Sequence, residues 1–444
     1  MVLNMRRFVG IKIVIFGIIT SLAISGSLAF AWTTKDKNTN QKIDLNYCLK
    51  TARDNNPRLN AARYRMQSAK DAIAEARAEF LPSVHAFSSY DRNYFEGAGE
   101  YDSYSSGFSF TQPIFRGGKI WQNYQEAKRE YEAARQAYFT VLIDVIQDVS
   151  TSYFSTLEQK HLITVNEENL KSAKYHLELT KARFKVGLTN KADVLKARVE
   201  KAQAEVDLIK VKNEFLQAMA RLNKSMGVAV VRKFNLADTY NNLLDPGKLN
   251  LIKALDEAKA SRPEMKQINA QIKKQQAAIK LAQSDFWPQV NARGNYEWSG
   301  REFNSQKRSW DVGVNLDISL FSGFGTVASV SKARKVLLEL EHQRLDLSDQ
   351  IDLEVYSALL NLKASYAEID ATRQLVLSAE ENLRVIEGLY KEGLANFIDV
   401  IDAQSSLTSA RTQHIQAIYK HHINETNYRR AVGSEADFAG LVDQ

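Results

Sequence analysis

The sequence predicts a mostly α-helical protein with transmembrane β-strands, built from a helix–strand–strand–helix unit that occurs twice. The first observation is that the 444-residue chain repeats itself at an offset of 206 residues, the separation of Pro57 from Pro263. The second is a very long stretch without glycine or proline in each half, and the third is a pair of alternating apolar and polar segments in each half. A fixed repeat period indicates a duplicated architecture. The matching pairs include Phe80 and Phe286, Pro82 and Pro288, Phe115 and Phe321, Gly187 and Gly393, and Gly227 and Gly433.

Residues 1–31 have the pattern of an export signal. Three basic residues precede an apolar run over residues 13–24, and Ala29-Phe30-Ala31 has the small-residue spacing of a cleavage site. We therefore expect the mature chain to begin at Trp32. An uncleaved membrane anchor is the alternative, which the short apolar run disfavours.

Composition excludes several classes of function. The net charge is +7, three of the basic residues lie in the leader, and no basic stripe with interleaved aromatic residues indicates nucleic-acid binding. Cys48 is the only cysteine, which rules out an intrachain disulfide. The Arg116-Gly117-Gly118-Lys119 segment lacks the spacing of a phosphate-binding loop. We expect no enzyme, no metal and no cofactor. We also expect three helix histidines without a carboxylate at metal-ligand spacing to be solvated, namely His414, His421 and His422.

Each repeat begins with a helical segment that a proline interrupts. Residues 45–80 and 251–286 read as helix with a break at Pro57 and at Pro263. The residue before a proline disfavours the helical region, so the next prolines, Pro82 and Pro288, place the stops.

Two strands follow in each repeat, at about residues 84–94, 104–115, 290–299 and 309–321. From Trp310 to Leu320 every second residue is apolar or aromatic. Period-2 alternation over ten residues fits a transmembrane strand of ~9–11 residues. An ordinary half-buried hairpin of a soluble protein is the alternative. Aromatic residues near the loop ends suggest a membrane girdle, namely Tyr90, Tyr94, Tyr104, Trp298 and Trp310.

Long helices come next, at about residues 119–186 and 326–391, and a second helix runs back in each repeat, at 190–226 and 396–432. Asn190 and Asn396 are suited to cap the returning helices. A sustained seven-residue apolar period indicates coiled-coil packing. In the second repeat this period is formed by Val355, Leu362, Ile369, Val376, Leu383 and Tyr390. The equivalent residues of the first repeat are Val149, Thr156, Ile163, Leu170, Leu177 and Phe184. A second row adjoins the first in the second repeat and consists of Ile351, Ala358, Ser365, Thr372, Ala379 and Ile386.

These elements divide the chain into a first repeat (32–227), a linking or equatorial segment (228–250), a second repeat (251–433) and a tail (434–444). Four strands are too few to close a barrel, and open sheet edges do not survive in lipid. The chain must therefore assemble with copies of itself, two giving eight strands and three giving twelve. An export signal, spanning strands and the absence of a spanning helix together indicate the outer membrane of a double-membraned bacterium.

The chain resembles the TolC family of outer-membrane efflux proteins over essentially its whole mature length. The resemblance rests on the duplicated unit, on Asn55-Asn56-Pro57-Arg58-Leu59, on Glu79-Phe80-Leu81-Pro82, and on two motifs that follow the long helices. These are Val186-Gly187-Leu188 with Asp193-Val194-Leu195, and Gly393-Leu394 with Asp399-Val400-Ile401-Asp402. The resemblance implies a homotrimer with a 12-stranded barrel in outer-membrane lipid, continued by a long periplasmic α-helical barrel. It further implies an exit duct of a tripartite efflux or type I secretion system, with a periplasmic adaptor protein and an inner-membrane transporter as partners.

The resemblance also implies site residues. Asp399 and Asp402 match the acids that ring the periplasmic constriction, with Tyr390 near the closing contacts and Asp193 as the first-repeat counterpart. Asp193 and Asp399 have a second explanation as acids in the first turn of a helix, whereas Asp402 lies one turn later, where like charges repel. The first repeat has Lys196 at that position. Ala395 replaces a basic residue that often follows the tip glycine in the family.

Gly187, Leu188, Gly393 and Leu394 match the tips on which the adaptor docks, although glycine also suits a tight helix turn. Two other classes of protein are alternatives. One is a periplasmic coiled-coil structural or adaptor protein without a membrane barrel, which would not need two strand pairs with an apolar face. The other is an enzyme, for which only the phosphate-loop and histidine segments offer support.

Overall fold

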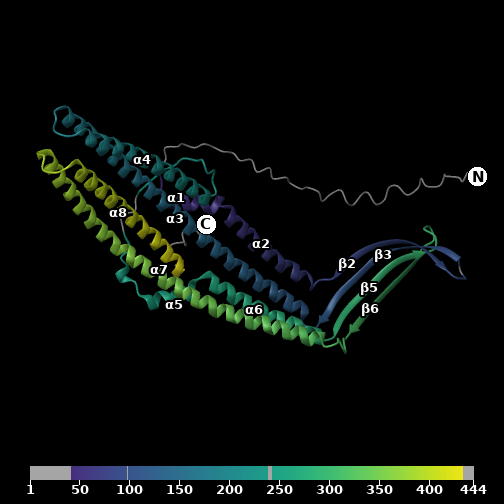
Figure 1. The fold of residues 1–444 in the computed structure, drawn as a ribbon. Helices are drawn as coiled ribbons and strands as arrows, with labels where there is room; N and C mark the ends of the chain where they lie inside the picture. Colours follow the sequence, from purple (N-terminus) through teal and green to yellow (C-terminus); the bar gives the residue numbers. More distant parts are fainter. Residues whose placement is uncertain (1–41, 98, 239–242, 434–444) are drawn as a thin grey trace, which may run out of the picture. The chain divides into compact units, whose positions relative to one another are not determined.

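The structure, a computed structural model, describes residues 42–97, 99–238 and 243–433. The predicted signal segment and tail lie outside these residues. The first repeat contains α1 (Leu45–Asn55), α2 (Pro57–Ala78), β2 (Ser83–Phe95), β3 (Gly99–Arg116), α3 (Lys119–Lys185) and α4 (Lys191–Met226). The second contains α5 (Leu251–Ser261), α6 (Pro263–Gln283), β5 (Gln289–Gly300), β6 (Lys307–Asp317), α7 (Gly325–Glu392) and α8 (Phe397–Val432), in the same order (Figure 1).

The proline breaks are also the places where each returning helix ends. At the first break, Asn56 caps α2 by accepting from the amides of Arg58 and Leu59 at 2.9 and 3.2 Å, and its Nδ2 donates to the Ser225 carbonyl at 2.8 Å. Gly227 ends α4 with φ 72°, so close to the break that a Cβ there would lie 2.5 Å from the Asn55 carbonyl. The second repeat uses Gly433 beside Arg262 in the same way. Each repeat is thus tied to itself at its middle.

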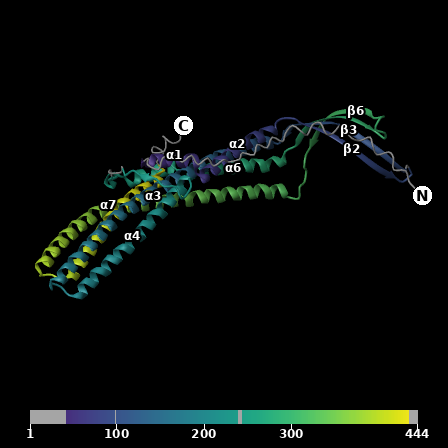
Figure 2. The same ribbon diagram turned by 90° about the horizontal axis from the view of Figure 1, so that it is seen from above.

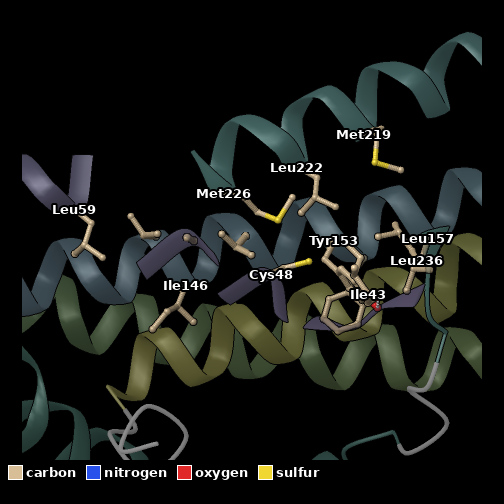
Figure 3. Packing of buried hydrophobic residues seen from close by; sticks show 14 of the residues in the cluster. Ile43, Cys48, Leu59, Ile146, Tyr153, Leu157, Met219, Leu222, Met226 and Leu236 are labelled. Carbon is tan, nitrogen blue, oxygen red and sulfur yellow. Dashed lines mark hydrogen bonds between the residues drawn. The ribbon is translucent and has the colours of Figure 1, made fainter. Parts of the chain in front are cut away.

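A hydrophobic core surrounds the first of these breaks. Tyr153 and Leu157 of α3, Leu222 and Met226 of α4 and Cys48 of α1 are fully buried together (Figure 3). Two short strands, β1 (Lys42–Ile43) and β4 (Asn235–Leu236), pair in parallel beside this core, and the Tyr153 hydroxyl donates to the Ala237 carbonyl. Burial, with a smaller contribution from Asp44, raises the pKa of the Cys48 thiol to about 12, so this cysteine is inert packing.

The seven-residue period predicted for the long helices is a packing seam. Val355, Leu362 and Ile369 of α7 are at most 3 % exposed, and the polar Ser365 and Thr372 beside them donate to backbone carbonyls of the turn before. α3 packs on α4 and α7 on α8, while α3 also contacts α8, which joins the two repeats (Figure 2). Phe184 is the exception at 44 % exposed, whereas its second-repeat counterpart Tyr390 is buried.

The four long strands form one antiparallel sheet in the order β2-β3-β5-β6. The central pairing of β3 with β5 joins the two repeats, and β2 and β6 are its two open edges. Across the described ranges, no helix combines the length and the apolarity that crossing a bilayer requires.

Two strand boundaries differ from the prediction. β3 begins at Gly99 rather than near 104, because the polar residues assigned to a loop continue the ladder with β2: Arg92 binds Glu100 at 2.6 Å and the Tyr90 hydroxyl donates to Asp102 at 3.0 Å. β6 ends at Asp317 rather than near 321, because its partner β5 begins at Gln289, the residue opposite Asp317. Backbone pairing, rather than side-chain alternation, sets where these strands end.

Candidate functional site

The register of the sheet gathers apolar side chains on one face and polar ones on the other. One rung places Phe108 opposite Tyr296, and Tyr296 opposite Trp310; the next continues with Phe110, Gly294 and Val312. The aliphatic residues of β6 on this face are exposed by 67–77 %. On the other face the Asn295 amide donates to Asp311 at 3.1 Å, among residues such as Arg293 and Glu297. A sheet with an unburied apolar face and unpaired edges is suited to lipid only if other strands complete it.

The five predicted girdle residues all lie on the apolar face but do not share one level. Tyr90 and Tyr104 are directly paired with ring centroids 4.9 Å apart, and Trp298 lies one rung nearer the helices, opposite Ser106. Trp310 lies a further rung inward, and Tyr94 lies two rungs outward, opposite Glu100. All five thus lie on the face expected to meet lipid, spread over several rungs of the sheet, and their role as a membrane girdle stays a prediction.

A second aromatic group lies where the strands join the helices, and sequence reasoning missed it. Its members are 41–75 % exposed. Phe80 and Phe286 are equivalent positions of the two repeats, and so are Phe115 and Phe321. The repeat itself could therefore have indicated this aromatic group. The group consists of Phe80, Phe115, Trp121, Phe286, Trp287, Phe321 and Phe324.

The two predicted tips are glycine turns of the same design. Gly187 and Gly393 have φ of 77° and 80°, and the following leucine amides donate back to Arg183 and Leu389 carbonyls at 2.9 and 2.8 Å. This six-to-one bond closes a helix end and needs a left-handed residue before it. Leu188 and Leu394 are left 66 % and 76 % exposed. The turn explanation therefore accounts for the glycines and leaves the exposed leucines without a structural role.

The predicted acids differ in what holds them. Asp193 accepts a hydrogen bond from the Thr189 hydroxyl at 2.6 Å, and Asp399 accepts one from the backbone N–H of Asn396 at 2.8 Å. Both acids therefore act at the start of a helix. Asp402 is exposed and has no side-chain hydrogen bond or ion pair within the described ranges. Lys196, its first-repeat counterpart, is exposed as well. Asp402 is therefore the acid for which capping offers no explanation.

Tyr390 is buried at the tips in a contact between the two repeats. It is 5 % exposed and packs on Phe397, and the Arg183 guanidinium lies 4.8 Å from the centre of its ring. Arg183 also donates to the Lys391 carbonyl at 3.3 Å. About two turns before Arg183 on α3, His176 Nε2 lies 3.5 Å from Glu387 Oε1. We call Arg183, His176, Glu387 and Tyr390 the tip clasp.

Sequence reasoning missed Arg183 and His176. They are seven residues apart on α3, next to the predicted row that ends in Leu177 and Phe184, so a polar row beside an apolar one was the available signal. Burial lowers the pKa of His176, while Glu387 opposes this shift and Lys391 adds to it. His176 is therefore neutral at pH 7.

The prediction that three histidines of α8 are solvated is wrong for two of them. His421 and His422 are 0 % and 3 % exposed, and His414 is half-buried. His421 Nδ1 lies 3.2 Å from Ser365 Oγ, and His422 stacks on Phe154 at 5.0 Å. Burial lowers the pKa of His421 and of His414. They lie on the α8 face that packs against α3 and α7, and the part of the chain that the structure describes holds no metal-ligand cluster.

Comparisons with known proteins agree with this geometry. Residues 48–228 and 254–434 each match the sequence model of a family described as outer membrane efflux protein. Outer membrane protein TolC of Vibrio cholerae is 26 % identical over 401 residues, which are 86 % of this chain and 89 % of that protein. The probable outer membrane lipoprotein SilC of Salmonella typhimurium is 24 % identical over 400 residues, 86 % of this chain and 84 % of that protein. The crystal structure of the Campylobacter jejuni CmeC outer membrane channel superimposes with a TM-score of 0.80 at 16 % identity, covering 90 % of both chains.

Proposed function

The chain belongs to the outer membrane efflux protein family and is an outer-membrane efflux channel, and from that premise we propose that three copies assemble into one continuous duct. Membership of this family favours the channel over the alternative, a periplasmic coiled-coil structural or adaptor protein without a membrane barrel. Three sheets of four strands supply twelve strands, with the open edge β2 of one copy beside β6 of the next. The observation that carries this proposal is the exposed apolar sheet face combined with two unpaired edges, since lipid tolerates neither edge.

Two unpartnered apolar seams on the helices support assembly independently. On α4, exposed residues recur at coiled-coil spacing: Leu195, Val199, Val206, Ile209 and Leu216. On α7, a second set is exposed on the side away from the buried rows: Leu353, Leu360, Leu375, Val385 and Leu389. Seams of this length on a water-exposed helix favour a partner helix. A neighbouring copy that places its α7 seam against α4 would cover both and continue the duct as a helical barrel.

In this assembly the helical tips form the periplasmic end. Three copies of Asp399 and Asp402 would meet there as a constriction that favours cations, and the free carboxylate of Asp402 supports that role. The tip clasp ties α3 to α7 within one chain, which supplies a closing contact where Ala395 offers none. Exposed Leu188 and Leu394 present apolar knobs to the periplasm. They suit docking by a periplasmic adaptor, which would in turn connect the duct to an inner-membrane transporter.

Measurement of the mass and conductance of the purified protein tests the proposal. We expect a particle with the mass of three chains that stays in solution only with detergent, and discrete conductance steps in a planar bilayer. Ile209→Asp places a charge in the α4 seam and should weaken the trimer, whereas Lys210→Asp on the exposed neighbouring position should not. A monomeric particle that remains soluble without detergent would contradict the proposal.

A further inference from the structure

An open groove of about 440 Å³ crosses the apolar face of the sheet, and it owes its depth to one missing side chain. Its sides are formed by Phe108, Phe110, Tyr296, Trp310 and Val312. Gly294 lies in the rung between Phe110 and Val312 and leaves the floor open. Its φ is not positive, and an added Cβ would meet only the Asp311 carbonyl and Val312 Cγ2, both at 3.7 Å. Neither the backbone nor the neighbours require glycine here, so what it provides is the hollow.

An unpaired positive charge lies on the same face, outward from the groove. Arg308 is opposite Trp298 and four residues before Val312, about 13 Å along the strand. It has no ion-pair partner in the described part of the chain. Arg92 of β2 faces the same way but is paired with Glu100 at 2.6 Å. The charge at Arg308 is therefore available to a ligand, and the groove next to it is apolar.

We propose that this groove binds one acyl chain of a phosphate-bearing lipid of the outer leaflet, with Arg308 binding the phosphate. The helices are periplasmic and join the sheet at one end, so the hairpins and Arg308 lie toward the cell exterior. A guanidinium donates a fork of hydrogen bonds that matches phosphate geometry. Trp298 lies opposite Arg308 and Tyr104 lies one rung further outward, and aromatic side chains prefer the headgroup boundary. The proposal rests on the outer-membrane placement but not on the number of copies in the assembly.

Native mass spectrometry of the detergent-solubilised channel, titrated with dimyristoyl phosphatidic acid, tests this site, with dimyristoylglycerol, which has the same acyl chains and no phosphate, as the comparison. We expect wild type to retain one phosphatidic acid per chain in preference to dimyristoylglycerol. Arg308→Gln should lose about tenfold in affinity for phosphatidic acid, the size of one charge-assisted contact, and Arg308→Lys should recover part of it. Gly294→Leu fills the groove and should abolish retention of both lipids.

Matched variants separate the site from general lipid coating. Arg92→Gln removes a charge on the same face, and Gly313→Leu adds the same side chain on the polar face, where nothing lies within 4 Å. Both should retain lipid as wild type does. Equal losses in Arg92→Gln and Arg308→Gln, or undiminished retention by Gly294→Leu, would overturn the proposal. The oligomer mass in the same spectra reports assembly separately, so failure to assemble is distinguishable from loss of the lipid.

Discussion

Single residues at the tips show how one residue type can serve two purposes. Asp193 and Asp399 each lie in the first turn of a helix and accept hydrogen bonds there, so their presence alone does not indicate a pore function. Asp402 accepts none and lies one turn from Asp399, where two like charges destabilise a helix by a few tenths of a kcal/mol. A residue that opposes local stability and has no local partner suggests a role outside the chain.

The first prediction concerns ion selectivity. Asp402→Asn should reduce the preference of the open channel for cations, and Asp399→Asn/Asp402→Asn should reduce it further together with block by divalent ions, because the ring then loses six carboxylates in three copies. Conductance in a planar bilayer under a salt gradient measures both. Asp370→Asn is the control, since it removes an exposed acid of α7 that lies away from the tips and pairs with Arg373. Unchanged selectivity and divalent block in the double variant would remove the constriction hypothesis.

The second prediction concerns the tip clasp. Arg183→Gln removes the charge over the Tyr390 ring and weakens the bond to the Lys391 carbonyl, so the closed end should loosen and the basal conductance should rise. A cation over an aromatic ring is worth about 0.5–2 kcal/mol, which corresponds to a several-fold change in open probability. Lys181→Gln is the control, because Lys181 is on the same helix turn but pairs only with Glu178 of its own helix. An identical conductance in both variants would argue against a clasp.

At the scale of elements, helices and strands end for different reasons. The long helices end at glycines that adopt a left-handed conformation, and the returning helices end at glycines packed against the proline breaks. The strands end where a partner strand ends, whatever their own alternation. Helix ends are therefore determined by the local sequence, whereas strand ends depend on the neighbouring strand.

Comparison of two glycines tests this account of helix ends. Gly227→Ala and Gly187→Ala both force alanine into a left-handed conformation, which costs about 1–2 kcal/mol. An added Cβ at Gly187 meets nothing within 4 Å, whereas at Gly227 it overlaps the Asn55 backbone. We expect Gly227→Ala to lower the free energy of unfolding clearly more than Gly187→Ala, as measured by thermal or denaturant unfolding in detergent. Equal effects would mean that the close contact at the break is not important for stability.

At the scale of the whole molecule, charged and polar groups join the two repeats. Arg430 of α8 contacts Asp144 of α3, Glu264 of α6 and Glu354 of α7 at 3.0–3.4 Å. Although burial alone raises the pKa of Glu264, hydrogen bonds and charge from Arg262 bring it below its usual range. The two repeats are thus held together by this network, by the β3–β5 pairing and by the contact of α3 with α8.

The buried histidines and the ion-paired Glu264 predict how the free energy of unfolding depends on pH. His176 and His421 have lowered pKa values in the folded chain, so below about pH 6.5 the unfolded chain binds protons that the folded chain does not. Stability should therefore fall from pH 7 to pH 5, by up to about 1.4 kcal/mol per histidine per pH unit. A further loss is expected below about pH 4.5, as Glu264 is protonated. Denaturant midpoints from pH 4 to pH 8 measure this. His176→Gln/His421→Gln should reduce the loss of stability between pH 7 and pH 5, leaving the contribution of His414 and the loss below about pH 4.5, and a variant as pH-sensitive as wild type would contradict the assignment.

The sequence by itself determined the duplication, the order of the elements and the coiled-coil rows, because a fixed offset, proline positions and a seven-residue period are local properties of the chain. It also indicated the acids and glycine turns at the tips. Only the tertiary structure decided the strand ends, the levels of the aromatic residues, the burial of His421 and His422, and the tip clasp. Each of these depends on which segments distant in sequence lie side by side, and a side chain such as Arg183 acquires its partners only when α3 and α7 are brought together.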